Sequence, residues 1–175
     1  NGTKESSKLD ALKELFKVVL ANDEKAIVFT QFREMAVILM RELKEYKPLL
    51  IAGGVATEER DENRRMFNED EEHKILVMTS AGSMGLNLQR ATAVVHYDIP
   101  WSISQTEQRE DRAHRHGQLG NVTVYRMMAK NTVDEYKLKV LYKKQATSEA
   151  VLGDNDIDEA RKVGLTKTDL RNILK

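Results

Sequence analysis

Short, continuous runs of apolar residues, separated by amphipathic helical stretches, constrain the fold of this chain more than any other feature. Such runs lie at Ile27-Val28-Phe29, Ile75-Leu76-Val77-Met78 and Ala93-Val94-Val95. Strands that are apolar on both sides have to be covered on both sides, as in the parallel sheets of α/β proteins. Because strands and helices alternate along the chain, the sequence predicts a parallel sheet with helices on both faces.

The expected elements can be placed along the whole sequence. Strands are predicted at residues 25–31, 49–51, 75–78, 93–97 and 122–128, and helices at 7–21, 32–46, 57–67, 102–116 and 132–145. We expect residues 1–147 to form one lobe, including a leading helix and a trailing brace helix. Residues 148–175 are predicted to be a flexible connection that ends in a short helix.

Composition excludes several classes of protein. The chain has 175 residues, which is enough for one core, and no apolar run approaches the length of a membrane span. It contains no cysteine, which rules out a disulfide framework and a thiolate zinc site. Its 28 basic and 28 acidic residues give a net charge of zero, so nucleic acid would have to bind at local basic patches. We expect no metal site of the protein's own and no membrane contact.

The predicted helix at residues 102–116 has clear start and stop signals. Ser102 and Gln105, three positions apart, match a capping box, and Gly117 suits the end of the helix. The helix should therefore begin just after Trp101.

Two arginines on this predicted helix suit a phosphate ligand. Gln108, Arg112 and Arg115 lie at positions i, i+4 and i+7, which share one helix face. A guanidinium is permanently charged and can donate to two phosphate oxygens at once. The alternative is a solvated helix face on which Asp111 pairs with Arg115.

Five motifs in order carry a resemblance to a known family. They are Lys25-Ala26-Ile27-Val28-Phe29-Thr30-Gln31-Phe32, Gly53-Gly54 with Arg60 and Phe67-Asn68, Thr79 to Leu88, Asp98-Ile99-Pro100-Trp101, and Gln108-xxx-Arg112-Ala113-His114-Arg115-xx-Gln118. Together they resemble the second, C-terminal RecA-like lobe of the SWI/SNF-type ATPases, which are superfamily-two helicase-like proteins. The resemblance covers roughly residues 8 to 145.

The resemblance implies how ATP would be used. The sequence contains no Gly-Lys-Ser/Thr phosphate-binding motif, so ATP and Mg²⁺ are expected mainly on a first lobe that precedes this chain. By resemblance, Arg115 is the arginine finger, Arg112 its neighbour at the phosphates and Gln108 a positioning residue. Gly85 and Asn87 resemble the motif beside the ribose, although a tight strand-to-helix turn would also explain them.

The resemblance also implies a track on double-stranded DNA. The expected contacts are hydroxyls, backbone amides and one aromatic ring near strand ends: Thr30, Gln31, Gly53, Gly54, Thr79, Ser80 and Trp101. Each polar residue could instead be a cap or turn, and Trp101 could be buried core. Groups of this kind bind phosphates without reading bases, so we expect tracking along the duplex backbone.

These expectations define one function and two alternatives. The chain is predicted to be the C-terminal lobe of a DNA-dependent ATPase that translocates on duplex DNA and remodels protein–DNA complexes. A strand-separating helicase lobe and a non-catalytic nucleic-acid-binding lobe are the alternatives. We expect the isolated lobe to be an inactive monomer that works with the first lobe of its own chain and a protein target on DNA.

An intracellular location, in a prokaryotic cytoplasm rather than a nucleus, is favoured. His73 and His96 are predicted to be ordinary surface and sheet residues.

Overall fold

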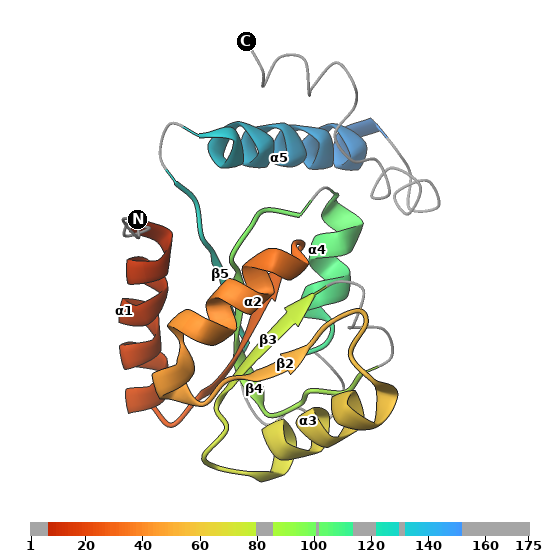
Figure 1. The fold of residues 1–175 in the computed structure, drawn as a ribbon. Coiled ribbons are helices and arrows are strands. Elements are labelled where there is room, and N and C mark those ends of the chain that lie inside the picture. The colour runs from red at the N-terminus through yellow and green to blue at the C-terminus, as the bar shows by residue number, and fades with distance from the viewer. Residues whose placement is uncertain (1–6, 80–85, 101, 114–121, 130–131, 152–175) are drawn as a thin grey trace. The chain divides into compact units, whose positions relative to one another are not determined.

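The computed structural model describes residues 7–79, 86–100, 102–113, 122–129 and 132–151 (Figure 1). The helices are α1 (Ser7–Ala21), α2 (Arg33–Glu42), the short 3-10 helix η1 (Lys44–Tyr46), α3 (Thr57–Glu69), α4 (Ile103–Glu110) and α5 (Val133–Val151). The strands are β1 (Lys25–Thr30), β2 (Leu49–Ile51), β3 (Ile75–Thr79), β4 (Ala91–His96) and β5 (Thr123–Arg126).

The described strands form one five-stranded sheet in the order β2-β3-β1-β4-β5. Every neighbouring pair is parallel. The prediction of a parallel α/β sheet is therefore confirmed. Because the strands are parallel, their carboxyl ends all meet at one edge, where the polar residues that follow β1, β2, β3 and β4 are brought together.

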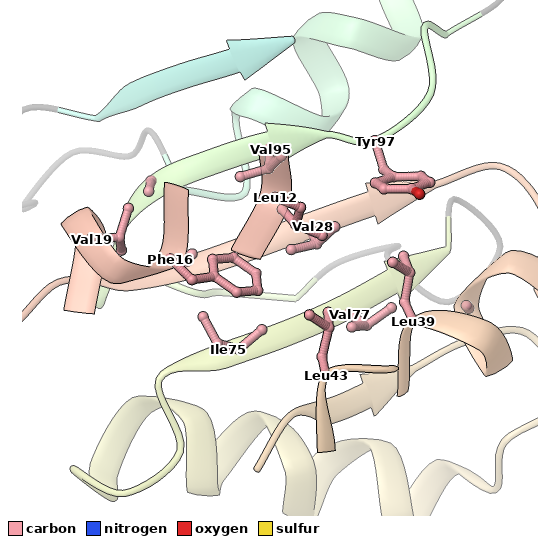
Figure 2. Close-up of a cluster of buried hydrophobic side chains, with 13 residues drawn as sticks. Leu12, Phe16, Val19, Val28, Leu39, Leu43, Ile75, Val77, Val95 and Tyr97 are labelled. Carbon is pink, nitrogen blue, oxygen red and sulfur yellow. The ribbon is translucent and has the colours of Figure 1, made fainter. Parts of the chain in front are cut away.

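Helices α1 and α2 cover one face of the sheet (Figure 1). Figure 2 shows Phe16 of α1 and Leu39 of α2 packed against side chains of the central strands, among them Val28 and Val77. All four of these side chains are fully buried. The alternation of side chains along a strand explains this arrangement, because Val28 points to this face while its neighbours point to the other.

Helix α3 covers the opposite face. Phe67 of α3 packs in a second buried cluster with Ile27 and Phe29 of β1 and with Met78 of β3. Ala113, which follows α4, is fully buried in the same cluster. The apolar runs thus supply both cores, and the prediction of helices on both faces is confirmed.

The chain divides into two compact units. The first comprises residues 1–98 and 109–127 and contains the whole sheet, whereas the second comprises residues 99–108 and 128–175. In the second unit Leu141 of α5 packs against Ile99, whose carbonyl accepts a hydrogen bond from the Lys137 ammonium. Helix α5 ends at Val151, and residues 152–175 lie outside the described part. The division at residue 147 stays a prediction.

Helix α4 is shorter than predicted. Ser102 caps it as expected, because its hydroxyl accepts a hydrogen bond from the Gln105 amide at 3.2 Å. The helix ends at Glu110, and the amides of Arg112 and Ala113 then donate to the carbonyls three residues earlier. The physical reason lies in tertiary contacts, because the Arg112 carbonyl accepts the Leu88 amide and Ala113 is buried in the core. The prediction that Arg112 continues the helix of Gln108 is therefore wrong.

Smaller differences concern other element ends. The helix expected at 32–46 is divided into α2 and η1, and β5 is four residues long. Ala56 occupies the cap position of α3. Among the described helices none is both long enough and apolar enough to cross a membrane.

Candidate functional site

Asp98, directly after Tyr97 at the end of β4, organises the polar end of β1. Its carboxylate accepts hydrogen bonds from the Thr30 hydroxyl at 2.5 Å and from the Gln31 side-chain amide at 3.0 Å. It also accepts the Gln31 backbone amide at 3.0 Å. The Thr30 hydroxyl in turn accepts the Phe32 amide at 3.2 Å. These groups therefore hold neighbouring strand ends together, and the role of Thr30 and Gln31 as phosphate contacts stays a prediction.

A second polar group joins the ends of β2 and β3. The Thr79 hydroxyl is buried and accepts a hydrogen bond from the Gly53 amide at 3.2 Å. The next residue, Gly54, is exposed and has φ +84°, in the left-handed region that favours glycine. Thr79 thus orders the backbone that presents Gly54 to solvent. Their contact with DNA remains a prediction.

Arg33, the first residue of α2, lies against this glycine turn. Its Nη1 is 3.2 Å from the place that a Cβ on Gly54 would occupy. The side chain is exposed, and within the described residues no carboxylate pairs with it. Sequence reasoning missed Arg33, although a cation directly after the polar end of a strand is a usable signal.

Arg112 and Asn87 occupy adjoining segments of the first unit. The Leu88 amide donates to the Arg112 carbonyl at 3.3 Å, which ties the segment carrying Asn87 to the turn carrying Arg112. Asn68 of α3 holds the same segment by donating to the Asn87 carbonyl at 3.1 Å. The predicted nucleotide residues Asn87 and Arg112 are therefore brought onto neighbouring pieces of backbone.

Both of these side chains keep buried polar atoms without partners. The Nε of Arg112 and the Oδ1 of Asn87 are buried and have no hydrogen-bond partner within the described residues. Buried polar groups in proteins are normally satisfied, so each exception calls for an explanation. The donor on Arg112 suits an anion, and the acceptor on Asn87 suits a ligand hydroxyl.

Arg112 has no ion pair, unlike most arginines in the described residues. Ion pairs join Arg41 to Glu42, Arg64 to Asp61, Arg65 to Glu62, Arg90 to Glu71 and Arg126 to Glu110. The described residues contain no ion pair of Arg112. Its guanidinium is therefore not neutralised by a carboxylate.

The other predicted site residues divide into two groups. Gln108 lies on α4 in the second unit, is exposed, and donates to the Ser104 hydroxyl over 3.5 Å. Ser80, Gly85, Trp101 and Arg115 lie outside the described residues. The roles of all these residues stay predictions.

His96 is more than the ordinary sheet residue that the sequence predicts. It is fully buried, stacks on Phe29, and lies 3.1 Å from a Glu110 oxygen and 3.4 Å from an Arg109 nitrogen. Burial lowers the pKa of His96, and although the Glu110 hydrogen bond raises it, the net pKa is below its ordinary value. The imidazole is therefore neutral near neutral pH. A histidine within an otherwise apolar strand run was the signal.

Glu110 is the carboxylate that lies beside His96. Burial raises its pKa, but the hydrogen bond from His96 and the charge of Arg126 outweigh that effect, so its pKa lies below its ordinary value. Glu110 is therefore ionised near neutral pH.

The described residues contain no cluster of three or more metal-ligating side chains.

Polar groups from several strands thus lie at the carboxyl edge of a parallel sheet. Comparison with known proteins identifies the family. The model of the helicase conserved C-terminal domain matches residues 7–117. An uncharacterized ATP-dependent helicase of Bacillus subtilis, YqhH, is 34% identical over 89% of this chain and 28% of its own length. The chromatin-remodeling ATPase INO80 of Mycosarcoma maydis is 33% identical over 89% of this chain and 8% of its own.

A solved structure is similar along nearly the whole chain. The Sulfolobus solfataricus SWI2/SNF2 ATPase core in complex with double-stranded DNA has a TM-score of 0.71 and 26% identity, over 98% of this chain and 36% of that one. The chain belongs to the helicase conserved C-terminal domain family, within which it is a second RecA-like lobe of the SWI/SNF type. It spans less than a third of the length of the two relatives.

Proposed function

We propose that this lobe completes the ATPase site of a motor that translocates on duplex DNA and remodels protein–DNA complexes. The observation that carries the proposal is Arg112, whose Nε is buried without a hydrogen-bond partner and whose guanidinium has no ion pair within the described residues. Desolvated, unpaired guanidiniums are costly to keep unless a ligand satisfies them. A phosphate is the anion that fits their planar donor geometry.

The proposed mechanism assigns each residue a task toward ATP. A first lobe outside this chain would hold ATP with Mg²⁺, and the metal would neutralise charge on the phosphates. When the two lobes close, Arg112 and Arg115 donate to the γ-phosphate and stabilise the charge of the transition state. Asn87 offers its free Oδ1 to a nucleotide hydroxyl. By resemblance, Gly85 would line the ribose side of the nucleotide and Gln108 would position the reacting groups.

The proposed DNA contacts follow the carboxyl ends of β1, β2 and β3. Gly53, Gly54 and Gln31 lie there, and Arg33 adds a positive charge beside Gly54. Thr30 and Thr79 order this edge through their hydroxyls, and Ser80 and Trp101 complete the predicted surface. Such contacts are independent of base sequence, which suits movement along the duplex. The similarity to a core solved in complex with double-stranded DNA supports this assignment.

The test is the DNA-stimulated ATPase activity of the full-length protein. We expect duplex DNA to stimulate turnover, and Arg115→Ala to abolish most of that stimulation. Arg65→Ala, on an exposed arginine paired within α3, is the matched control and should change nothing. Unchanged turnover with Arg115→Ala would remove the catalytic assignment of that residue.

A second assay separates the motor from its alternatives. A translocase displaces the third strand of a DNA triplex without separating the duplex, whereas a helicase releases a strand of the duplex itself. Triplex displacement alone is the expected result. Release of duplex strands would favour the strand-separating helicase, and the absence of any DNA-stimulated ATPase activity would favour the non-catalytic lobe.

A further inference from the structure

A group of four side chains lies directly beside the turn that carries Arg112. The group comprises His96 of β4, Arg109 and Glu110 of α4, and Arg126 of β5, all in the first unit. The Glu110 carboxylate accepts Arg126 Nη2 at 2.7 Å and lies 3.1 Å from His96 Nε2. Nη1 of Arg109 lies 3.4 Å from His96 Nδ1. We call this the anchoring group.

The chemistry of the partners fixes the proton on His96. A guanidinium can only donate, so His96 Nδ1, which faces Arg109, has to be the acceptor. The proton then lies on Nε2, from which it is donated to the ionised Glu110 carboxylate. A second proton on Nδ1 would confront the Arg109 charge. His96 is thus a neutral bridge that joins a buried cation to a carboxylate.

Arg109 also faces a second carboxylate and an aromatic ring. The Asp98 carboxylate lies 4.0 Å from Arg109 Nη2, and the Arg109 guanidinium lies over the Phe29 ring of β1 at 5.5 Å. Arg109 is only 2% exposed. Its position is therefore determined by Asp98, His96 and Phe29 together, and the end of α4 is attached to two strands of the sheet.

The backbone carries this attachment to Arg112. The Arg112 amide donates to the Arg109 carbonyl at 3.3 Å, and the Ala113 amide donates to the Glu110 carbonyl at 3.0 Å. The two residues held by His96 are thus the two whose carbonyls define the turn. A shift of either one would move Arg112.

We propose that His96 is a positioning residue that, by bridging Arg109 and Glu110, holds the turn in the place from which Arg112 acts on the phosphates of ATP. This inference rests on the proposed function. His96 does not itself touch the nucleotide in this account. It contributes to turnover through the placement of Arg112, so its loss should lower kcat and leave the KM for ATP unchanged.

The experiment compares His96→Phe with His96→Gln in the full-length ATPase. Phenylalanine removes both hydrogen bonds and keeps a flat ring, whereas glutamine keeps a donor near the position of Nε2. We expect His96→Phe to lower kcat about tenfold or more, with KM for ATP unchanged, because small misplacements of a catalytic group are costly. His96→Gln should recover part of that loss. The pH profile should also change: kcat of the wild type falls as His96 becomes protonated, and that acidic limb should be absent in His96→Gln.

The matched control is His73→Phe. His73 also pairs with a carboxylate, that of Asp70 at 2.9 Å, but it follows α3, before β3 begins. It should retain wild-type kcat. The inference is overturned if His96→Phe turns over as fast as His73→Phe. It is also overturned if His96→Phe lowers kcat and changes the KM for ATP as well, with no recovery of kcat in His96→Gln. Should His96→Phe fail to fold, the pH profile of His96→Gln decides the same question: loss of the acidic limb supports the inference, and a limb like that of the wild type overturns it.

Arg112→Ala in the same assay keeps the two proposals apart. An inactive Arg112→Ala enzyme beside an active His96→Phe enzyme would overturn the positioning role alone. A fully active Arg112→Ala enzyme would overturn the proposed function itself.

Discussion

Two neighbouring regions of the first unit differ in whether their polar groups have hydrogen-bond partners. In the anchoring group, Glu110 accepts from Arg126 and from the buried His96. Immediately after it, Arg112 and Asn87 keep a buried donor and a buried acceptor unsatisfied within the described residues. The His96 ring and the Glu110 carboxylate are thus paired within the protein, whereas Arg112 Nε and Asn87 Oδ1 have no partner among the described residues.

The difference separates stability from function along a few residues of chain. Satisfied, partly buried charges favour one conformation, and the loss of one partner leaves the other uncompensated. An unpaired arginine contributes little to folding, but it remains available to an anion. We therefore expect substitutions in the anchoring group to reduce the free energy of unfolding, and substitutions of the unpaired arginines to reduce ligand binding and turnover.

The largest expected effect on stability is that of Glu110→Ala. The substitution removes the carboxylate that pairs with Arg126 and His96, and hydrogen bonds to charged groups are worth about 2 kcal/mol. The free energy of unfolding of the chain, measured by denaturant titration, should fall by about that amount. Asp111→Ala, at the exposed neighbouring position, is the control and should have no measurable effect. Equal effects at the two positions would contradict the comparison.

The next effect is a pH dependence that belongs to His96. Because the folded pKa of His96 is lowered, the unfolded state binds the extra proton more readily, and stability falls as the pH drops below the unfolded pKa. That decline should begin at about pH 6.5, with a slope of up to about 1.4 kcal/mol per pH unit. It should be weaker in His96→Gln. Parallel stability curves for wild type and variant would show that His96 does not titrate as described.

Glu110 makes a separate contribution at lower pH. Its folded pKa is lowered, so the stability that it provides is present at neutral pH and is lost as the pH falls through that folded pKa. The decline due to Glu110 therefore lies at more acidic pH than the decline due to His96.

A smaller effect is expected at Gly54, which extends the comparison to the β2–β3 edge. An alanine there would adopt an unfavourable left-handed conformation and would meet the Arg33 guanidinium at 3.2 Å. We expect Gly54→Ala to reduce the free energy of unfolding by about 1 kcal/mol, the typical penalty for that conformation. Thermal unfolding of the chain would measure it. A neutral substitution would show that the turn accommodates a side chain without strain.

The smallest expected effect is that of Arg33→Ala on DNA binding. If Arg33 contacts a phosphate, its loss should weaken duplex binding and should reduce the slope of log K against log salt by about 0.9. Arg41→Ala is the matched control, since Arg41 is an exposed arginine of the same helix that is paired with Glu42. Fluorescence anisotropy over a range of salt concentrations measures both variants. Identical slopes would exclude Arg33 from the DNA surface.

The sequence predicted the sheet because its signals were local. The apolar run at Ile75-Leu76-Val77-Met78 has few alternatives to a buried parallel strand, and Ser102 caps its helix as its position indicates. The confirmed family assignment followed from motifs, not from periodicity.

Local periodicity failed where long-range contacts decide the backbone. The helical pattern of α4 continues past Glu110, but the Leu88 amide and the core around Ala113 end the helix there. The same limit concealed the anchoring group, since Arg126 lies 16 residues from Glu110 in the sequence. Arg33 was missed because its neighbour Gly54 comes from a different strand end.

The most direct test of the account measures turnover and stability of Arg112→Ala in the same full-length preparation. An arginine that acts on the phosphates is worth roughly a thousandfold in rate, whereas an unpaired side chain adds little to folding. We predict that kcat for DNA-stimulated ATP hydrolysis falls by about a thousandfold while the unfolding midpoint does not fall below the wild-type value. Wild-type turnover, or a loss of stability as large as that of Glu110→Ala, would contradict the account.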